Sequence, residues 1–199
     1  MTDVIIQMSL SLDGYIAGPN DSDTNGLGDR GERLHNWMFA GGGAPGEGLT
    51  GADQEVFDDL RSATGAMITG RRLYDITHGW EGTHPFGAVP TFVVSRDVPE
   101  EVPSGATPFI FVRDGIASAV AQAKEAAGER DVYVIGGAST VRQLLDAGLA
   151  DELRIDLIPF LLGGGIRLFD KLGRKPISLE QVRTTSSSAV THVRYRVLP

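Results

Sequence analysis

Residues 131–140 read DVYVIGGAST, an apolar run that meets two glycines and then small residues suited to the start of a helix. A continuous run of this kind is typical of a strand that is buried on both faces of a parallel sheet. Two interpretations of Gly136 and Gly137 are open. Either they form a tight turn with Ser139 capping the helix, or they let a phosphate approach bare backbone at a helix N-terminus. In the second case, Ser139 and Thr140 would add hydroxyl donors.

The alternation of strand and helix continues on both sides of this stretch and predicts a parallel sheet with helices on its faces. Two consecutive strands at the end of the chain predict that the sheet gains antiparallel strands there. We expect a single domain over residues 1–199, with an insertion-like segment at about 20–50. Strands are predicted at residues 4–12, 66–69, 91–95, 108–112, 132–135, 152–162, 177–184 and 189–198, and helices at 30–39, 52–63, 71–77, 114–128 and 139–149.

Composition restricts the class of protein. The chain has 199 residues, a net charge of −8 and no cysteine, which excludes disulfides, a thiolate nucleophile and cysteine-ligated metals. The negative charge disfavours nucleic acid as a partner, because phosphate backbones are bound by clustered Lys and Arg. No stretch approaches the roughly 20 apolar residues of a membrane span, and the start lacks a basic segment typical of a secretory signal. The 4 histidines lack metal-site spacing. We therefore predict no metal, no membrane association and a cytoplasmic location.

Other predicted strand ends also carry residues that suit a ligand, which in open α/β sheets binds beyond the carboxyl ends of the strands. The segment ITGRRLYD places Arg71 and Arg72 at a helix N-terminus, where cations oppose the helix dipole unless an anion binds between them. The segment VVSRD adds Ser95 and Arg96. Three arginines with several hydroxyls indicate more negative charge than a pyrophosphate carries, as in a 2′-phosphorylated adenosine. The alternative is that the arginines extend into water.

The segment SLSLDGYIAG near the start combines a turn signal, Asp13-Gly14, with small or apolar residues. Ile16 and Ala17 are suited to lie against a flat ring. The alternative is a surface loop that follows the first strand.

Taken in order, the segments SLDGYIA, ITGRRLYD, VVSRD, VYVIGGAST and ADELRIDLIPFLLGGGIRLFD resemble the dihydrofolate reductase superfamily. The chain is most similar to the bacterial branch related to the reductase domain of riboflavin biosynthesis. The resemblance covers nearly the whole chain, and the segment at about 20–50 departs from it. It implies a three-layer α/β fold with a mixed eight-stranded sheet, mostly parallel with antiparallel C-terminal strands and helices on both faces. Relatives often dimerise, so a homodimer is expected, and a monomer is the alternative.

The resemblance further implies NADPH as cofactor and hydride transfer to a small heterocyclic substrate. Gly70, Arg71 and Arg72 would line the site of the adenosine 2′-phosphate, with Ser95 and Arg96 nearby. The pyrophosphate would lie against residues 135–140. The nicotinamide would contact Ile16 and Ala17, and Ser9 would approach its carboxamide. The implied cofactor-binding residues are Ser9, Ile16, Ala17, Gly70, Arg71, Arg72, Ser95, Arg96, Ile135, Gly136, Gly137, Ala138, Ser139 and Thr140.

Two carboxylates are candidates for the acid that organises a proton for a reduced C=N bond. Folate reductases place an acid early in the helix before the strand that ends in GR, which indicates Asp53. The alternative for Asp53 is a capping box with Thr50. Alternation in LRIDLI places Asp156 on the face opposite its apolar neighbours, on a strand that lines the pterin site in folate reductases. The alternative for Asp156 is a half-exposed residue on a less buried face.

Three functions remain open. The first is an NADPH-dependent reductase of a pterin- or pyrimidine-like heterocycle, similar to dihydrofolate reductase. The second is the 5-amino-6-(5-phosphoribosylamino)uracil reductase of riboflavin biosynthesis, in which an acidic residue commonly precedes the glycine pair where this chain has Ile135. The third is a protein that binds NADP(H) without catalysis.

Overall fold

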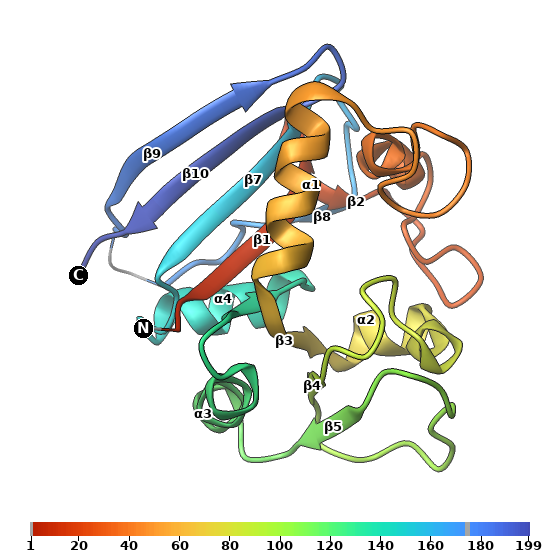
Figure 1. Cartoon of the computed structure of the whole chain (residues 1–199), viewed down its shortest axis with the longest axis vertical. Coiled ribbons are helices and arrows are strands. Elements are labelled where there is room, and N and C mark those ends of the chain that lie inside the picture. Colours follow the sequence, from red (N-terminus) through yellow and green to blue (C-terminus); the bar gives the residue numbers. More distant parts are fainter. Residues whose placement is uncertain (1, 174–175) are drawn as a thin grey trace.

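An eight-stranded sheet forms the centre of the molecule (Figure 1). The computed structural model describes residues 2–173 and 176–199. Neighbouring strands are parallel as far as β7, and β10 and β9 then pair antiparallel. The order across the sheet is β5 (Phe109–Val112), β4 (Thr91–Val94), β3 (Thr64–Gly70), β6 (Asp131–Val134), β1 (Val4–Ser11), β7 (Glu152–Ile158), β10 (Thr191–Val197) and β9 (Leu179–Ser186). The mixed sheet predicted from the sequence is confirmed.

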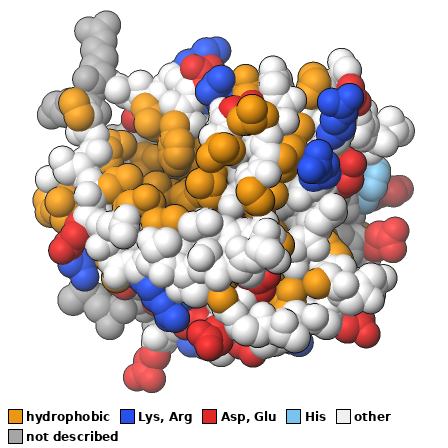
Figure 2. Space-filling view, turned by 90° about the horizontal axis from the view of Figure 1, so that it is seen from above, with side chains coloured by type: hydrophobic (Ala, Val, Ile, Leu, Met, Phe, Trp, Pro, Cys, Tyr) orange, Lys and Arg blue, Asp and Glu red, His pale blue; other side chains and the backbone are white. Residues whose placement is uncertain are grey.

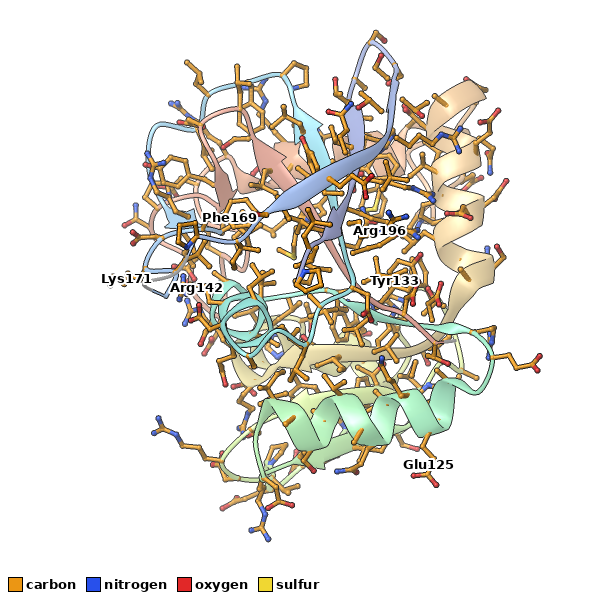
Figure 3. All side chains as sticks on the ribbon, turned by 90° about the vertical axis from the view of Figure 1, so that its left-hand side faces the viewer. Glu125, Tyr133, Arg142, Phe169, Lys171 and Arg196 are labelled. Atoms are coloured by element: carbon orange, nitrogen blue, oxygen red, sulfur yellow. The ribbon has the colours of Figure 1, made fainter. Side chains whose placement is uncertain are left out.

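Alternation along the central strands divides the apolar core into two layers. Ile5 and Tyr133 pack with Leu60 on the face covered by α1 (Gly51–Ala63). Ile6 and Val134 belong to the larger core on the opposite face, which α3 (Ile116–Ala127) and α4 (Ala138–Asp146) cover. Figure 3 shows α1 on one side of the strands and α4 on the other, with Tyr133 between the strands and α1. Because both layers are built mainly from apolar side chains, the polar residues that do lie on the α1 face are conspicuous.

The segment expected as a helix at 30–39 forms instead two short 3₁₀ helices, η1 (Gly31–Leu34) and η2 (Asn36–Phe39). A further 3₁₀ segment, η3 (His78–Gly82), follows α2 (Arg71–Ile76). A glycine-rich stretch directly after η2 is a poor continuation for an α-helix, because glycine loses more backbone entropy on ordering than other residues. Within η2, Trp37 is buried at 4% exposure, while Asn36 and Phe39 are exposed.

The strand expected over residues 152–162 is too long, because β7 ends at Ile158. Pro159 follows, and proline has no N–H with which to continue the hydrogen-bond ladder. Two short strands were not predicted: β2 (Tyr15–Ala17) and β8 (Ile166–Arg167) pair antiparallel as a separate two-stranded sheet. This small sheet holds Ile16 and Ala17 in place beside the end of β1.

On the surface, hydrophobic side chains gather in a continuous patch on the face seen from above, with charged side chains around it (Figure 2). A single chain does not test the homodimer, which stays a prediction. In the part of the chain that the structure describes, no helix is long and apolar enough to cross a membrane.

The contact between β8 and β2 depends on Gly165. This residue has φ +118°, and a Cβ atom there would lie 2.0 Å from the carbonyl oxygen of Ala17. A Cβ atom on the neighbouring Gly164 would meet no heavy atom within 4 Å. Glycine at 165 therefore permits the close approach of the two segments.

We predict that Gly165→Ala lowers the free energy of unfolding by about 1–3 kcal/mol or more, because the methyl group overlaps backbone and the φ angle disfavours a side chain. Gly164→Ala is the matched control and should change it by less than about 0.5 kcal/mol. Urea unfolding measures both. Equal unfolding free energies for the two variants would contradict the packing described for β2.

Candidate functional site

A large cleft opens at the carboxyl ends of the parallel strands. Its cavity volume is about 1280 Å³. Residues that directly follow β3, β4, β5 and β6 line it, together with β1, β2, β7 and the segment between β2 and α1. Segments far apart in the sequence thus meet at one edge of the sheet, as expected for ligand sites in parallel α/β sheets.

The glycine pair lies in the middle of this edge. The backbone N–H of Gly70 donates to the carbonyl oxygen of Gly136 at 2.8 Å, which joins the ends of β3 and β6. Gly136 has φ +118°, a conformation that favours glycine. A Cβ atom on Gly137 would meet no heavy atom within 4 Å, so this backbone is open on that side.

The helix that follows the glycine pair begins without a side-chain cap. Gly137 is the N-cap residue of α4, and no capping side chain accepts a hydrogen bond from the first N–H groups of the helix. The proposed capping role of Ser139 is therefore wrong; its hydroxyl lies 3.3 Å from the amide of Gln143 instead. The first N–H groups of a helix have no partner within the helix, so α4 presents free donors and the positive end of its dipole to the cleft.

Arg71 and Arg72 begin α2 beside this turn, and both line the cleft. Arg71 forms ion pairs with Asp75 at 2.7 Å and with Asp97 at 2.9 Å, and its Nη1 donates to Ser95 Oγ at 3.3 Å. Arg72 forms an ion pair with Asp21. In this structure carboxylates, rather than water alone, partner both guanidinium groups.

Three further arginines line the same end of the cleft: Arg96 after β4, Arg113 after β5, and Arg142 on α4. Among the described residues, no carboxylate oxygen is within ion-pairing distance of any of them. Figure 3 labels Arg142 on the outer side of α4. Within the described part of the chain, this end of the cleft therefore holds cations without carboxylate partners.

The opposite end of the cleft is lined by aromatic and aliphatic side chains together with polar ones, and one polar cluster there is buried. Ser9 and Asp156 are cross-strand neighbours on β1 and β7, and both are buried, at 7% and 3% exposure. Gln7 Nε2 donates to Asp156 Oδ2 at 2.6 Å. The indole N–H of Trp37 donates to Ser9 Oγ at 3.2 Å. Asp156 is therefore a buried carboxylate and not a half-exposed surface residue.

Asp53 lies at the start of α1, close to Asp156 but outside the cleft lining. Thr50 makes no side-chain cap of α1, so the capping-box interpretation is wrong. The Asp53 carboxylate instead contacts His192 Nε2 at 3.1 Å, and His192 Nδ1 contacts Asp156 Oδ1 at 2.6 Å. Asp53 lines a separate cavity of about 290 Å³ on the other side of Trp37.

The structure brings most of the sequence-predicted site residues into the one cleft. Those that line it are Ser9, Ile16, Ala17, Gly70, Arg71, Arg72, Ser95, Arg96, Ile135, Gly137, Ala138, Ser139, Thr140 and Asp156. Gly136 does not line the cleft; its carbonyl oxygen accepts the N–H of Gly70 instead. Asp53 is the one predicted residue that lines the neighbouring cavity instead.

Sequence reasoning missed four functional candidates: Trp37, Arg113, Arg142 and His192. Arg113 had an available signal, because PFIFVRD ends a strand with arginine just as VVSRD does. Arg142 lies one helical turn after the glycine pair. His192 and Trp37 had no local signal, since their roles depend on contacts across 36 and 28 residues of sequence.

Known proteins resemble this chain over nearly its whole length. The model of the RibD C-terminal domain family matches residues 2–193. The chain belongs to this family. Uncharacterised protein YyaP of Bacillus subtilis (strain 168) is 28% identical over 207 residues, which cover 96% of this chain and 93% of YyaP.

Solved structures show the same fold. The crystal structure of a putative riboflavin biosynthesis protein from Shewanella sp. PV-4 has a TM-score of 0.72 and 25% identity, and each chain is covered in full (100%). Dihydrofolate reductase from Enterococcus faecalis, complexed with NADP(H), has a TM-score of 0.59 and 13% identity, with 98% of this chain and 96% of that chain covered. At this identity the second likeness concerns the fold alone.

The residues at one end of the cleft are of the kinds that could hold a phosphorylated dinucleotide. It combines an uncapped helix start, open backbone at Gly137, hydroxyls at Ser139 and Thr140, and arginines at one end. Among the described residues, no group of three or more His, Cys, Asp or Glu side chains is arranged to hold a metal ion. The absence of a metal stays a prediction.

His84 supports the wall of the cleft that is formed by the segment after η3. Its Nδ1 accepts the backbone N–H of Phe86 at 3.1 Å, and its backbone N–H donates to Thr107 Oγ1 at 2.8 Å. Burial lowers the pKa of His84 from 6.5 to about 4. The side chain is therefore neutral in the folded protein at neutral pH.

We predict that His84 makes the free energy of unfolding depend on pH in the acid range. As the pH falls from 6.5 to about 4, the unfolded chain binds a proton at this residue and the folded chain does not. The free energy of unfolding should decrease over that range by about 3 kcal/mol, since each pKa unit is worth about 1.4 kcal/mol. Asn keeps an acceptor but does not titrate, so His84→Asn should remove this share of the pH dependence. Parallel pH curves for the two proteins in urea unfolding would contradict the prediction.

Proposed function

We propose that this chain is an NADPH-dependent reductase that transfers a hydride to a pterin- or pyrimidine-like heterocycle. The observation that carries the proposal is the polarity of a single cleft. One end holds arginines around an uncapped helix start, and the other holds the buried carboxylate of Asp156 beside lining residues from β1 to α1 that include no lysine or arginine. Membership of the RibD C-terminal domain family supports the same reaction class.

Residues of this chain would hold the cofactor by charge and by open backbone. The start of α4 suits the pyrophosphate, because the N–H groups that precede Thr140 and the helix dipole favour negative charge, and Ser139 and Thr140 add hydroxyl groups. Arg71, Arg96 and the hydroxyl of Ser95 suit the 2′-phosphate. The chemistry that NADPH supplies when bound is donation of a hydride.

Binding of a 2′-phosphate requires rearrangement of carboxylates at the arginine end. Arg72 is paired with Asp21, which belongs to the segment between β2 and α1. A phosphate that replaces Asp21 would release this segment from α2. Arg96 and Arg113 need no such exchange. We infer that these two arginines contribute most of the initial attraction, and that Arg71 and Arg72 bind after their carboxylates move.

The substrate end favours a ring without a phosphate. None of the cleft-lining residues from β1 to α1 is a lysine or an arginine. Trp37, Phe57 and Phe86 supply flat apolar walls, which suit an aromatic heterocycle. His35 Nδ1 is buried without a hydrogen-bond partner among the described residues and is available to a polar atom of a ligand. Ile135 replaces the acid found before the glycine pair in riboflavin-pathway reductases, which also argues against the phosphoribosyl substrate.

We predict that replacing Arg71, Arg72 or Arg96 by Ala weakens NADPH binding much more than NADH binding. The expected loss is about 1–3 kcal/mol for each charged hydrogen bond to the 2′-phosphate. Arg183→Ala is the control, because Arg183 lies on β9 with a side chain 53% exposed and pairs with Glu55. Calorimetric titration measures each constant. Equal weakening of NADPH and NADH would mean that these arginines do not recognise the 2′-phosphate.

We predict that the wild-type protein oxidises NADPH when given dihydrofolate or another unphosphorylated oxidised pterin or pyrimidine, and much more slowly when given the phosphoribosylaminouracil. Absorbance of the reduced nicotinamide follows the reaction. Faster turnover of the phosphorylated uracil would favour the riboflavin-pathway alternative. Tight NADPH binding without oxidation by any pterin, flavin or pyrimidine would favour the non-catalytic NADP(H)-binding alternative. No NADPH binding would end all of these assignments.

A further inference from the structure

A histidine bridges two carboxylates on the α1 face of the sheet. His192 of β10 contacts Asp156 of β7 through Nδ1 at 2.6 Å and Asp53 of α1 through Nε2 at 3.1 Å. All three residues are buried, with exposures of 4%, 3% and 9% respectively. Buried charges are costly unless they are paired, so the three side chains must share charge and protons among themselves.

The sheet register fixes this arrangement. Ser9, Asp156 and His192 are direct neighbours across β1, β7 and β10. Because they occupy one row, their side chains share the face that α1 covers. Asp53 then reaches the far nitrogen of His192 from α1, and the ring of Trp37 stands edge-on to the imidazole, with centroids 4.9 Å apart.

The two carboxylates face different spaces. Asp156 lines the large cleft, whereas Asp53 lines the smaller cavity. Trp37 lines both and separates them. Asp156 is therefore the carboxylate in reach of a ligand in the cleft, and Asp53 acts on such a ligand only through His192.

The neighbours of the imidazole favour its charged form. Burial alone would lower the pKa of His192, but hydrogen bonds and charges from Asp156 and then Asp53 outweigh it and raise the pKa. These two are the charged groups that face the ring from β7 and α1. β9 opposes His192 with Thr185, and η2 opposes it with Trp37. As an imidazolium, His192 donates from both nitrogens.

We propose that His192 is the proton store of the reductase site, that Asp156 passes its proton to the substrate nitrogen, and that Asp53 is a positioning residue. The proposal rests on the proposed reductase function. The Nδ1–H bond of His192 breaks as an O–H bond forms on Asp156. That O–H bond then breaks as an N–H bond forms on the substrate, and the ring is left neutral with its proton on Nε2. When the product leaves, Asp156 takes up a proton from solvent in the cleft and returns it to Nδ1.

The test compares Asp53→Asn, Asp156→Asn and the control Asp58→Asn. Asn at 53 keeps an acceptor for Nε2–H and removes only the charge. Asp58 lies on the same helix, is exposed and bonds to Gln54. The first readout needs no ligand: titration of the His192 ring followed by NMR. We expect the titration to move to lower pH in Asp53→Asn and to stay in place in Asp58→Asn. An unmoved titration in Asp53→Asn would overturn the role of Asp53.

The second readout is the pH profile of NADPH oxidation. We expect kcat of the wild type to fall as the pH rises through the His192 titration, because a neutral imidazole gives up its remaining proton far less readily than an imidazolium. The fall should begin at lower pH in Asp53→Asn, with KM for NADPH within about two-fold of wild type. Asp156→Asn should lose about 100-fold or more in kcat at every pH.

These outcomes separate this proposal from the proposed function. A wild-type protein that turns over, with an Asp53→Asn profile that coincides with it, would overturn the His192 proton store and leave the reductase assignment intact. A larger loss of kcat in Asp53→Asn than in Asp156→Asn at low pH would reverse the roles of the two carboxylates. Absence of turnover in the wild type would overturn both.

Discussion

The hydrogen bond from Gly70 N–H to the Gly136 carbonyl oxygen, 2.8 Å long, is the contact on which the site depends. It holds the ends of β3 and β6 together at the carboxyl edge of the sheet. A Cβ atom on Gly70 would lie 2.5 Å from Thr140 Oγ1, so the approach is possible only for glycine unless Thr140 moves. Through this contact the arginines that begin α2 and the uncapped start of α4 face one space, where neither alone would form a binding site.

The positive charge of the cleft is gathered at one end. The arginines lie on α2 and α4 and after β4 and β5, while the lining residues from β1 to α1 include no lysine or arginine. Asp156 is buried, and contacts with Gln7 and His192 stabilise its carboxylate in place of solvent. The segment between β2 and α1 extends along both ends of the cleft. It contributes Trp37 to the lining near Asp156 and Asp21 to the ion pair with Arg72.

Much of the fold, and the gathering of arginines and glycines at one end of the cleft, could be predicted from local sequence. Apolar runs such as VYVI read correctly as buried strands, and the arginines and glycines at strand ends converge because parallel strands share one carboxyl edge. The rest depended on contacts that leave no local pattern. β8 has only two residues and exists through its pairing with β2. Residues 30–39 had helical composition but formed 3₁₀ turns before a glycine-rich stretch. A capping box with Thr50 stayed open for Asp53 because its partner, His192, lies 139 residues away.

A crystal structure of the protein with bound NADPH tests the central claim most directly. The pyrophosphate is expected against Gly137, Ala138 and Ser139, with the 2′-phosphate among Arg71, Arg72 and Arg96 and the nicotinamide beside Ile16 and Ala17. Asp156 should then face the space next to the nicotinamide, and Asp53 should remain behind His192. Density for the cofactor elsewhere on the molecule, or arginines still paired only with Asp21, Asp75 and Asp97 while the cofactor is bound, would contradict it.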